Sequence, residues 1–310
     1  MKCDIIIPVW NEKFLTSKCI DSIRKNTHIP YRILIIDNDS DPETSQYLKK
    51  LTNESPDSIS LKRNDKNLGF PKAVNQGIAL SSAPYLCILN SDTEVYDGWL
   101  TEMVRVAESS ADIGIVNPAS NNLGRKYTQP ASKDYGKYIE MSACIGFSML
   151  IKREVVDKIG KLDEIYSPGN FEDTDFSRRA IKADFRCVMA EASYVYHVQN
   201  TGFKKRKDWD ERFKRNLNIF NERWGKVKRI AYIIKDIKEN DLSAAERNIR
   251  DFLKNGDWVY VFLKKGCIRP DLKEHCSLRV FELGSFIFDI KVFWRVVTRK
   301  KKFDKVVTLR

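Results

Sequence analysis

The chain has 310 residues, of which 42% are hydrophobic and 31% charged, a composition that excludes a disordered protein and allows one large core or two modest ones. No run of about 18 uncharged apolar residues occurs, and no basic segment followed by an apolar one opens the chain, so we expect neither a membrane-spanning helix nor a secretory signal. The 7 cysteines are scattered without a Cys-x-x-Cys pair, which predicts reduced thiols in a cytoplasmic protein.

The positive charge of the chain is concentrated near its end. Residues 226–310 hold 21 Lys and Arg against 11 Asp and Glu, a net charge of +10, whereas the whole chain carries +12. Residues 1–225 therefore carry only +2 (12 − 10). This difference predicts two domains, a near-neutral domain over residues 1–225 and a basic extension over residues 226–310.

Short apolar runs alternate with helical patterns in the first part of the chain. Such runs are too short for a helix and are typical of buried strands. They occupy 4–9, 33–36 and 85–89, and helical periodicity covers 12–26, 43–53 and 71–81. This alternation predicts an α/β fold with a mainly parallel sheet covered on both faces. Ligands of such sheets bind beyond the carboxyl ends of the strands.

The second half of the chain predicts more elements. Residues 143–151 have the pattern of a strand, and residues 172–183 and 207–224 have the pattern of helices. The basic extension is predicted to be mostly helical, with helices over about 227–239, 242–255 and 276–298.

Polar side chains follow the predicted strands. Asn11 comes after the first, Asp37 ends the second, and Asp92 comes after the third, so we expect the site at this edge of the sheet. Asp37 could accept hydrogen bonds from a nucleobase or a ribose hydroxyl, and Asp92 suits Mg²⁺ or Mn²⁺. A role in the turn is the alternative interpretation of each residue.

Residues 67–77 open a predicted helix with the sequence Asn-Leu-Gly-Phe-Pro-Lys-Ala-Val-Asn-Gln-Gly. Gly69 permits close backbone approach, the helix N-terminus favours a phosphate, and Lys72 would add a positive charge. An ordinary loop and helix start is an equally good interpretation of this motif taken alone.

Three carboxylates, Glu172, Asp173 and Asp175, lie within four positions at a predicted helix start. Neighbouring acids raise one another's pKa, which suits a general base, and we assign this role to Asp173. Glu172 is a candidate for binding an acceptor hydroxyl, and Asp175 has an alternative structural role with Arg178 or Arg179. His197 follows a predicted strand and is interpreted as a metal ligand or phosphate contact, with a structural histidine as the alternative.

Several motifs occur in a fixed order: Ile7-Pro8-Val9-Trp10-Asn11, Asp37-Asn38-Asp39-Ser40, Asn67-Leu68-Gly69-Phe70 with Asn75, Asn90-Ser91-Asp92-Thr93-Glu94, Gly146, Glu172-Asp173-Thr174-Asp175 and His197. In this order and spacing the chain resembles family 2 glycosyltransferases with a GT-A fold, especially the rhamnosyltransferase-like and galactofuranosyltransferase-like branches. The resemblance covers about residues 3–224. One departure is Asn90, which stands at the first position of the metal motif, where a carboxylate is expected.

The resemblance implies an inverting transfer from a UDP- or dTDP-sugar to a hydroxyl of a glycan, a lipid-linked glycan or a protein, in the synthesis of bacterial surface polysaccharide or glycoconjugate. Asp173 would be the base, and Glu172 is the second catalytic candidate, as a contact of the acceptor hydroxyl. Asp92 and His197 would hold Mn²⁺ or Mg²⁺ on the diphosphate. The implied donor-binding residues are Pro8, Val9, Asn11, Asp37, Asn67, Gly69, Phe70, Lys72, Asn75, Ser91 and Gly146.

Other functions stay open at this point: a protein O-glycosyltransferase, another type of sugar-nucleotide or phosphosugar enzyme, and a degenerate GT-A fold that serves as a binding or scaffolding module. The second would need a Gly- and Arg-rich phosphate loop, which residues 7–11 lack. Scaffolding would not need Asp37, Asp92, Asp173 and His197 together, which argues against the third.

The basic extension lies outside the resemblance. Residues 278–298 are rich in apolar side chains and precede Arg299-Lys300-Lys301-Lys302, a pattern that predicts an amphipathic helix on an anionic membrane surface. Packing on the first domain or on a homodimer partner is an equally good interpretation. No nucleic-acid motif accompanies the charge, so we expect no nucleic-acid partner. We expect a cytoplasmic protein, with peripheral binding to the inner face of the cytoplasmic membrane as an option.

Overall fold

The computed structural model describes residues 3–121, 123, 127–198 and 208–309. The chain divides into two compact units: unit 1 comprises Met1–Ile139 and Ala143–Arg223, and unit 2 comprises Glu140–Ser142 and Trp224–Arg310. The main segment of unit 2 thus begins at Trp224, next to the domain boundary expected at residue 225. The catalytic role of residues 1–225 and the peripheral role of the extension remain proposals.

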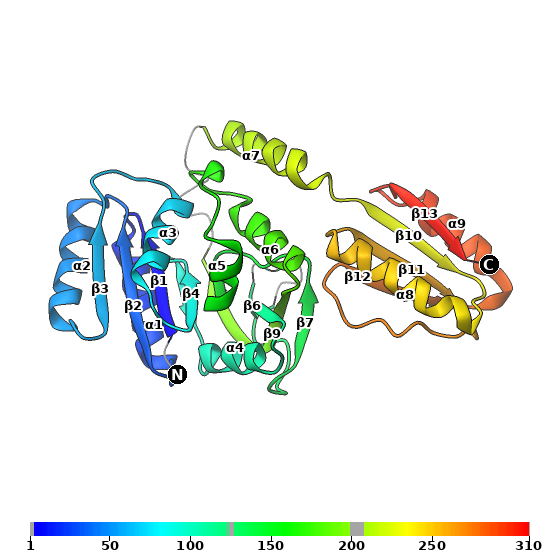
Figure 1. Ribbon diagram of the computed structural model, residues 1–310, viewed down its shortest axis with the longest axis horizontal. Helices are drawn as coiled ribbons and strands as arrows, with labels where there is room; N and C mark the ends of the chain where they lie inside the picture. The colour runs from blue at the N-terminus through cyan, green and yellow to red at the C-terminus, as the bar shows by residue number, and fades with distance from the viewer. Residues whose placement is uncertain (1–2, 122, 124–126, 199–207, 310) are drawn as a thin grey trace. The chain divides into compact units, whose positions relative to one another are not determined.

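Unit 1 is built on a mixed sheet (Figure 1). Its strands in the described residues are β1 Cys3–Val9, β2 Tyr31–Asp37, β3 Ile59–Arg63, β4 Tyr85–Leu89, β5 Thr93–Val95, β6 Ile113–Ala119, β7 Tyr138–Met141, β8 Ser148–Lys152 and β9 Arg186–His197. Their order is β3-β2-β1-β4-β8-β6-β9-β5, and β7 pairs with β9 outside this path. Most neighbours are parallel, but β8 is antiparallel to β4 and β6, and β5 is antiparallel to β9. The predicted α/β class with a mainly parallel sheet is confirmed.

Helices connect and flank these strands. They are α1 Lys13–Asn26, α2 Pro42–Glu54, α3 Phe70–Leu80, α4 Trp99–Glu108, α5 Arg153–Ile159, the short 3-10 helix η1 Glu164–Tyr166, α6 Glu172–Lys182 and α7 Trp209–Trp224. The five helices predicted in this region are confirmed, with ends displaced by one or two residues. Local signals explain why helix α2 begins where it does. The Asp41 carboxylate caps the helix by accepting the N–H of Thr44 at 2.8 Å, and Pro42 occupies the first turn.

The strand pairing brings several of the predicted site residues to the ends of neighbouring strands. The register of β1 on β2 sets Pro8 beside Ile36 and Val9 beside Asp37. The antiparallel pairing of β5 with β9 sets Thr93 opposite His197, so the turn after β4 meets the end of β9.

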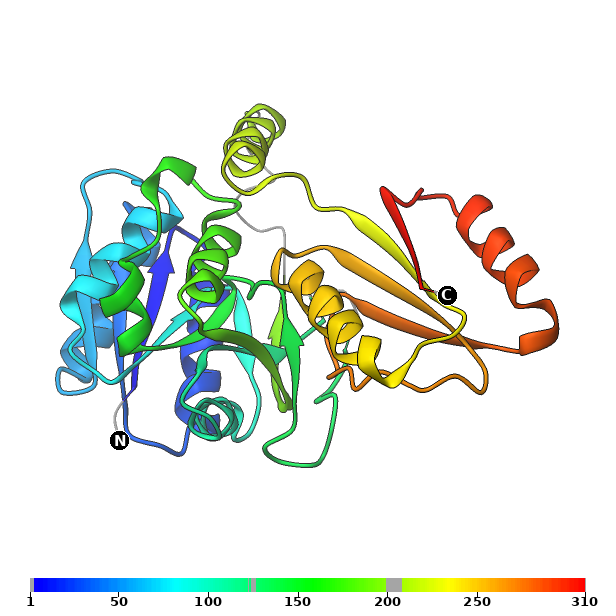
Figure 2. The same ribbon diagram turned by 45° about the vertical axis from the view of Figure 1, so that its right-hand side comes forward.

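Unit 2 contains a second sheet, whose strands are all parallel in the described residues. Its elements are β10 Arg229–Ile234, α8 Glu239–Lys254, β11 Trp258–Lys264, β12 Leu278–Leu283, the 3-10 helix η3 Ser285–Ile287, α9 Phe288–Val297 and β13 Lys305–Leu309. The strand order is β12-β11-β10-β13. Helices α8 and α9 cover opposite faces, because Ile249 of α8 packs with Tyr232 whereas Val292 of α9 packs with Ile233 (Figure 2).

This sheet corrects the prediction of a mostly helical extension. The helix expected over 242–255 is present as α8, but residues 227–239 contain β10, the region 276–298 is divided between β12 and α9, and β11 was not predicted. Alternate residues of β10 enter two different cores, so the strand is apolar on both faces and shows no alternation of polarity. Such a run is typical of a parallel strand covered on both sides.

Candidate functional site

A cavity of about 340 Å³ lies in unit 1 and joins segments that are far apart in the chain. The predicted site residues in its wall are Phe70, Gly146, Glu172, Asp173 and His197. The wall also contains Asn90, Ile145, Phe147, Gly169, Asn170, Phe171, Thr174 and Phe213, which were not predicted as site residues. Most of these are aromatic, apolar or glycine residues, whose types carry no chemical signal in a sequence.

Asp173 lies in the first turn of α6, and hydrogen bonds orient its carboxylate. The backbone N–H of Gly146 donates to Oδ2 at 2.8 Å, and the backbone N–H of Thr174 donates to Oδ1 at 2.6 Å. The hydroxyl of Thr174 donates to the same Oδ1 at 3.1 Å. Burial raises the pKa of Asp173, and these hydrogen bonds oppose the rise. Asp173 is therefore an oriented carboxylate with increased proton affinity, as a general base requires.

Glu172 is the more deeply buried of the two adjacent acids. Only 6% of its surface is exposed, and its Oε2 has no hydrogen-bond partner among the described residues. Burial, followed by the negative charge of Asp173, raises the pKa of Glu172 well above its ordinary value. A desolvated carboxyl oxygen without a partner is costly, so a hydroxyl of a bound ligand would stabilise it.

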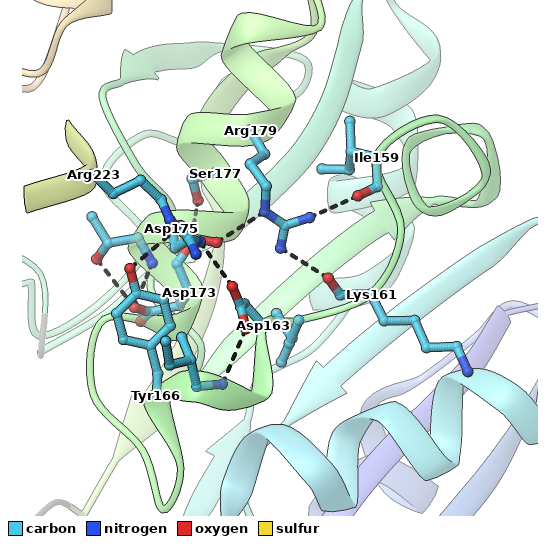
Figure 3. A network of polar contacts seen from close by, with 12 residues as sticks. Ile159, Lys161, Asp163, Tyr166, Asp173, Asp175, Ser177, Arg179 and Arg223 are labelled. Carbon is cyan, nitrogen blue, oxygen red and sulfur yellow. Dashed lines mark hydrogen bonds and ion pairs between the residues drawn. The ribbon is translucent and has the colours of Figure 1, made fainter. Parts of the chain in front are cut away.

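A network of ion pairs fixes the first turns of α6 (Figure 3). Asp175 is fully buried and accepts hydrogen bonds from Nε of Arg179 at 2.9 Å and from Nη1 of Arg223 at 2.8 Å. Arg223 also binds Asp163 at 2.8 Å, which joins α7 and the segment before η1 to this helix. The alternative structural role of Asp175 is therefore present, with Arg179 as its partner on the helix.

Asp92 and His197 form a close pair beside the cavity. Nε2 of His197 lies 3.1 Å from Oδ1 of Asp92. The ring of Phe147 stacks on the imidazole with 5.2 Å between the ring centroids and an interplanar angle of 11°. The pairing of β5 with β9 therefore sets the backbone position of His197, and the ring of Phe147 packs on its imidazole.

The surroundings of this pair fit a divalent cation. Oδ1 of Asn90 is buried without a hydrogen-bond partner in the described part of the chain, and the amide nitrogen of the same residue lies 3.5 Å from Nε2 of His197. A carboxylate oxygen, an imidazole nitrogen and an unpaired amide oxygen are ligands that Mn²⁺ accepts, and substrate phosphates commonly add more. No group of three His, Cys, Asp or Glu side chains suited to a metal occurs among the described residues, so a cation here would depend on Asn90 and on the substrate.

Asp37 lies at the end of β2, where both of its carboxylate oxygens are engaged. The N–H of Ser40 donates to Oδ1 at 2.9 Å, and Nη1 of Arg63 binds Oδ2. Asn11 joins the same turn, since its N–H donates to Oγ of Ser40 at 2.9 Å. Arg63 was not predicted as a site residue, although its place at the end of β3 sets it beside Asp37 in register. The Asp37 side chain is fully buried, so a nucleobase that reaches it would also meet the guanidinium of Arg63, which is one-third exposed.

Several predicted donor-site residues do not line the cavity of Asp173. Lys72 and Asn75 line a second cavity of about 370 Å³, and the Asn75 amide donates to the backbone oxygen of Leu162 at 2.9 Å and to Glu164 at 3.0 Å. Phe70 and Lys72 therefore face different cavities, which the helix-start motif did not suggest. Ser91 is half-buried in the turn after β4.

Position 69 requires glycine because the protein's own chain packs against it, and not only because a phosphate could approach there. Its φ is +86°, and a Cβ there would lie 2.7 Å from Cα of Pro168. The N–H of Phe70 donates to the carbonyl of Pro168 at 2.8 Å, and the Asn67 side chain accepts the N–H of Gly69 at 2.9 Å. The close backbone approach expected for a phosphate is made by the protein's own segment.

Residues 4–160, just over half of the chain, match the sequence profile of Glycosyl transferase family 2. The chain belongs to this family. Membership confirms the resemblance stated from the sequence and the enzyme class that it implied, whereas the rhamnosyl or galactofuranosyl branch stays a prediction. The match ends before Asp173 and His197, so their roles depend on the geometry described above.

The chain is also similar to individual proteins of bacteria and archaea. The chain is 27% identical to the uncharacterized glycosyltransferase YwdF of Bacillus subtilis over 73% of the chain and 85% of the relative. It is 23% identical to glycosyltransferase AglE of Haloferax volcanii over 60% of the chain and 63% of that protein. It is 24% identical to the poly(ribitol-phosphate) beta-glucosyltransferase of Bacillus spizizenii over 65% of the chain, which spans only 33% of that protein.

Solved structures with the same fold include glycosyltransferases with bound donors. S. aureus TarS 1–349 in complex with UDP-GlcNAc has a TM-score of 0.57 at 16% identity, over 82% of this chain and 72% of TarS 1–349. GalNAc-T7 with UDP, GalNAc and Mn²⁺ has a TM-score of 0.57 at 17% identity, over 65% of the chain and 44% of that protein. Mannosyltransferase PcManGT of Pyrobaculum calidifontis with GDP-Man and Mn²⁺ has a TM-score of 0.56 at 16% identity, over 69% of this chain and 61% of that protein's chain. At these identities the likeness shows the fold, which is the predicted GT-A fold.

Proposed function

We propose that this family 2 enzyme is an inverting, metal-dependent glycosyltransferase. It would move a sugar from a UDP- or dTDP-sugar to a hydroxyl of a glycan or lipid-linked acceptor in the synthesis of bacterial surface polysaccharide or glycoconjugate. The observation that carries the proposal is one cavity of about 340 Å³ that holds the oriented carboxylate of Asp173, the unsatisfied carboxyl of Glu172 and His197, which pairs with Asp92. The proposed base and two of the residues proposed to hold the cation, His197 and Asn90, thus line the same cavity.

Asp173 is the proposed general base. The acceptor hydroxyl passes its proton to Asp173 while its oxygen forms a bond to the anomeric carbon. The bond from that carbon to the diphosphate oxygen breaks, and the nucleoside diphosphate leaves with the electron pair. Attack opposite the leaving group inverts the anomeric configuration. The N–H groups of Gly146 and Thr174 hold the carboxylate in place during this step.

Glu172 is proposed to bind a hydroxyl of the acceptor. Its raised pKa keeps a larger fraction protonated than in an exposed glutamate, so the carboxyl can donate as well as accept a hydrogen bond. The unpartnered Oε2 is the atom that such a hydroxyl would satisfy.

Asp92, His197 and Asn90 are the residues proposed to hold Mn²⁺ or Mg²⁺, whose charge would offset the charge that develops on the leaving diphosphate. Asp37, with Arg63, is proposed to contact the nucleobase. GalNAc-T7 and PcManGT bind Mn²⁺, and TarS binds UDP-GlcNAc, which supports a divalent metal and a UDP-sugar. The relative that acts on poly(ribitol-phosphate) supports a surface polymer as the acceptor.

The first test is a thermal-shift panel of UDP, dTDP, GDP and CMP, each with Mn²⁺, Mg²⁺ or EDTA. A ligand that binds the native state raises the melting temperature by mass action. We expect a rise with UDP or dTDP that needs the metal, and this result would name the donor class. No rise with any nucleotide would contradict the proposal, and an equal rise in EDTA would contradict its metal dependence.

A further inference from the structure

Helix α9 of unit 2 has two apolar stripes, of which only one is buried by the fold. Phe288 and Val292 are 3% and 5% exposed and pack against the sheet of unit 2. A second set of large apolar side chains faces away from this core. Its members, with their exposed fractions, are Phe286 99% in η3, just before the helix, and Ile290 58%, Phe293 61%, Trp294 60% and Val297 45% in α9. We call these five residues the exposed stripe.

The spacing of the exposed stripe is that of a helix face. Ile290, Phe293, Trp294 and Val297 occupy positions i, i+3, i+4 and i+7, which lie on one side of an α-helix. Three of the five side chains of the stripe are aromatic. Contiguous apolar surface of this kind marks an interaction site, because single exposed apolar residues are ordinary but clusters are not.

A basic run adjoins the exposed stripe. Residues 289–305 hold 7 Lys and Arg against 2 Asp, a net charge of +5 (7 − 2). One of the two acids, Asp289, is paired with Lys235 at 2.6 Å. Lys300 and Lys301 are exposed directly after the helix. The partner of the stripe is therefore expected to combine apolar material with negative charge.

We propose that α9 and the basic run bind the surface of an anionic lipid bilayer. The exposed stripe would enter the boundary between headgroups and acyl chains, and exposed basic side chains such as Lys300 and Lys301 would contact lipid phosphates. Among the described residues no helix is long and apolar enough to cross a membrane, so the binding would be peripheral. A second copy fits less well, because a two-fold contact between stripes would bring +5 towards +5.

The test is flotation of the full chain with vesicles of phosphatidylcholine, alone or mixed with phosphatidylglycerol. We expect binding to the mixed vesicles to exceed binding to the neutral ones by on the order of tenfold, and to weaken with salt.

The double variant Phe293→Ser/Trp294→Ser should lower binding by on the order of tenfold or more. The triple variant Lys300→Gln/Lys301→Gln/Lys302→Gln should remove the preference for anionic lipid. Tyr135→Ser is the matched control, because Tyr135 is an aromatic residue of unit 1 that is 71% exposed.

Three results would overturn the proposal. The first is failure of the unmodified chain to float with anionic vesicles, and the second is undiminished binding by the double variant. The third is a dimer in analytical ultracentrifugation that the double variant dissociates while neither protein binds vesicles, because a second copy would then cover the stripe. The nucleotide thermal shift should be the same in all variants, so loss of membrane binding and failure of the proposed transfer function can be told apart.

Discussion

Oδ1 of Asp92 and Nε2 of His197 lie 3.1 Å apart although 105 positions separate the two residues in the chain. The antiparallel pairing of β5 with β9 creates this proximity by aligning Thr93 with His197. Asn90, whose buried Oδ1 is unpartnered among the described residues, belongs to the same turn as Asp92. These three side chains make the metal proposal testable by single substitutions.

His197→Ala should weaken Mn²⁺ binding by at least tenfold, because it removes the imidazole ligand of the pair. Asn90→Asp should strengthen Mn²⁺ binding, because a carboxylate replaces an unpaired amide oxygen at nearly the same shape. Both affinities can be measured by calorimetry or by electron paramagnetic resonance of free Mn²⁺. Equal Mn²⁺ affinity in all three proteins would place the metal elsewhere.

Asp173→Asn should lower the rate of sugar transfer by on the order of 10²- to 10⁴-fold and leave nucleotide binding intact, because an amide cannot accept the acceptor proton. The readout is nucleoside diphosphate release in the presence of acceptor, beside the nucleotide thermal shift. Asp184→Asn is the control, since this exposed residue lies just after α6 and its φ of +68° suits Asn. Transfer at the normal rate by Asp173→Asn would exclude Asp173 as the base.

Glu172→Gln should stabilise the protein at neutral pH while it lowers transfer. The pKa of Glu172 is raised in the folded protein, whereas an unfolded glutamate titrates near 4.3. The stability contributed by the protonated carboxyl is therefore present below about pH 4 and is lost as the pH rises through the folded-state pKa. Glutamine does not ionise, so the variant should gain about 0.5–2 kcal/mol at neutral pH and less in acid. Unfolding in urea between pH 4 and 8 measures this difference, and a gain that does not change with pH would argue against the titration of Glu172.

Gly69→Ala should destabilise the protein by more than Gly136→Ala. Both glycines have positive φ, +86° and +81°, so both substitutions carry a backbone cost of about 1–2 kcal/mol. An added Cβ at Gly69 would also overlap Cα of Pro168, whereas one at Gly136 would have nothing within 4 Å. The overlap should add about 1–3 kcal/mol to this cost. Urea unfolding measures it as the difference between the free energies of unfolding of the two variants. Equal losses of unfolding free energy in the two variants would show that the segment around Pro168 moves away from the added Cβ at no energetic cost.

Asp175→Asn should cost about 3 kcal/mol of unfolding free energy, because it removes the charge that Arg179 and Arg223 share in a buried site. Urea unfolding gives this value directly. Transfer by the remaining folded protein should also fall, since the first turn of α6 carries Asp173. A variant of normal stability would mean that the two guanidinium groups find other partners at no cost.

Local pattern was sufficient for much of unit 1. The buried run 4–9 and the helical periodicity that follows it predicted the first elements, and the polar residues after the strands predicted which edge of the sheet gathers Asn11, Asp37 and Asp92. These signals depend on neighbouring residues, so they can be read along one segment. Arg63 was missed because its partner Asp37 lies 26 positions earlier and only the pairing of β2 with β3 brings them together.

Unit 2 shows where local pattern is ambiguous. The run 230–234 in β10 has the same character as the run 4–9, yet it was predicted to be helical as part of the segment 227–239. Burial from both faces removes the polar alternation that identifies a strand, and only the cores on each side of β10 resolve the ambiguity.

The sequence by itself determined the family resemblance, the α/β alternation and the positions of Asp173, Asp92 and His197, because residue type and order suffice for these. Tertiary structure alone decided that Asp92 meets His197, that Glu172 keeps an unpartnered oxygen, that Gly69 packs on Pro168 and that the exposed stripe of α9 has no cover from the sheet of unit 2. These properties depend on burial and on contacts between distant segments, and neither is a property of any one stretch of chain.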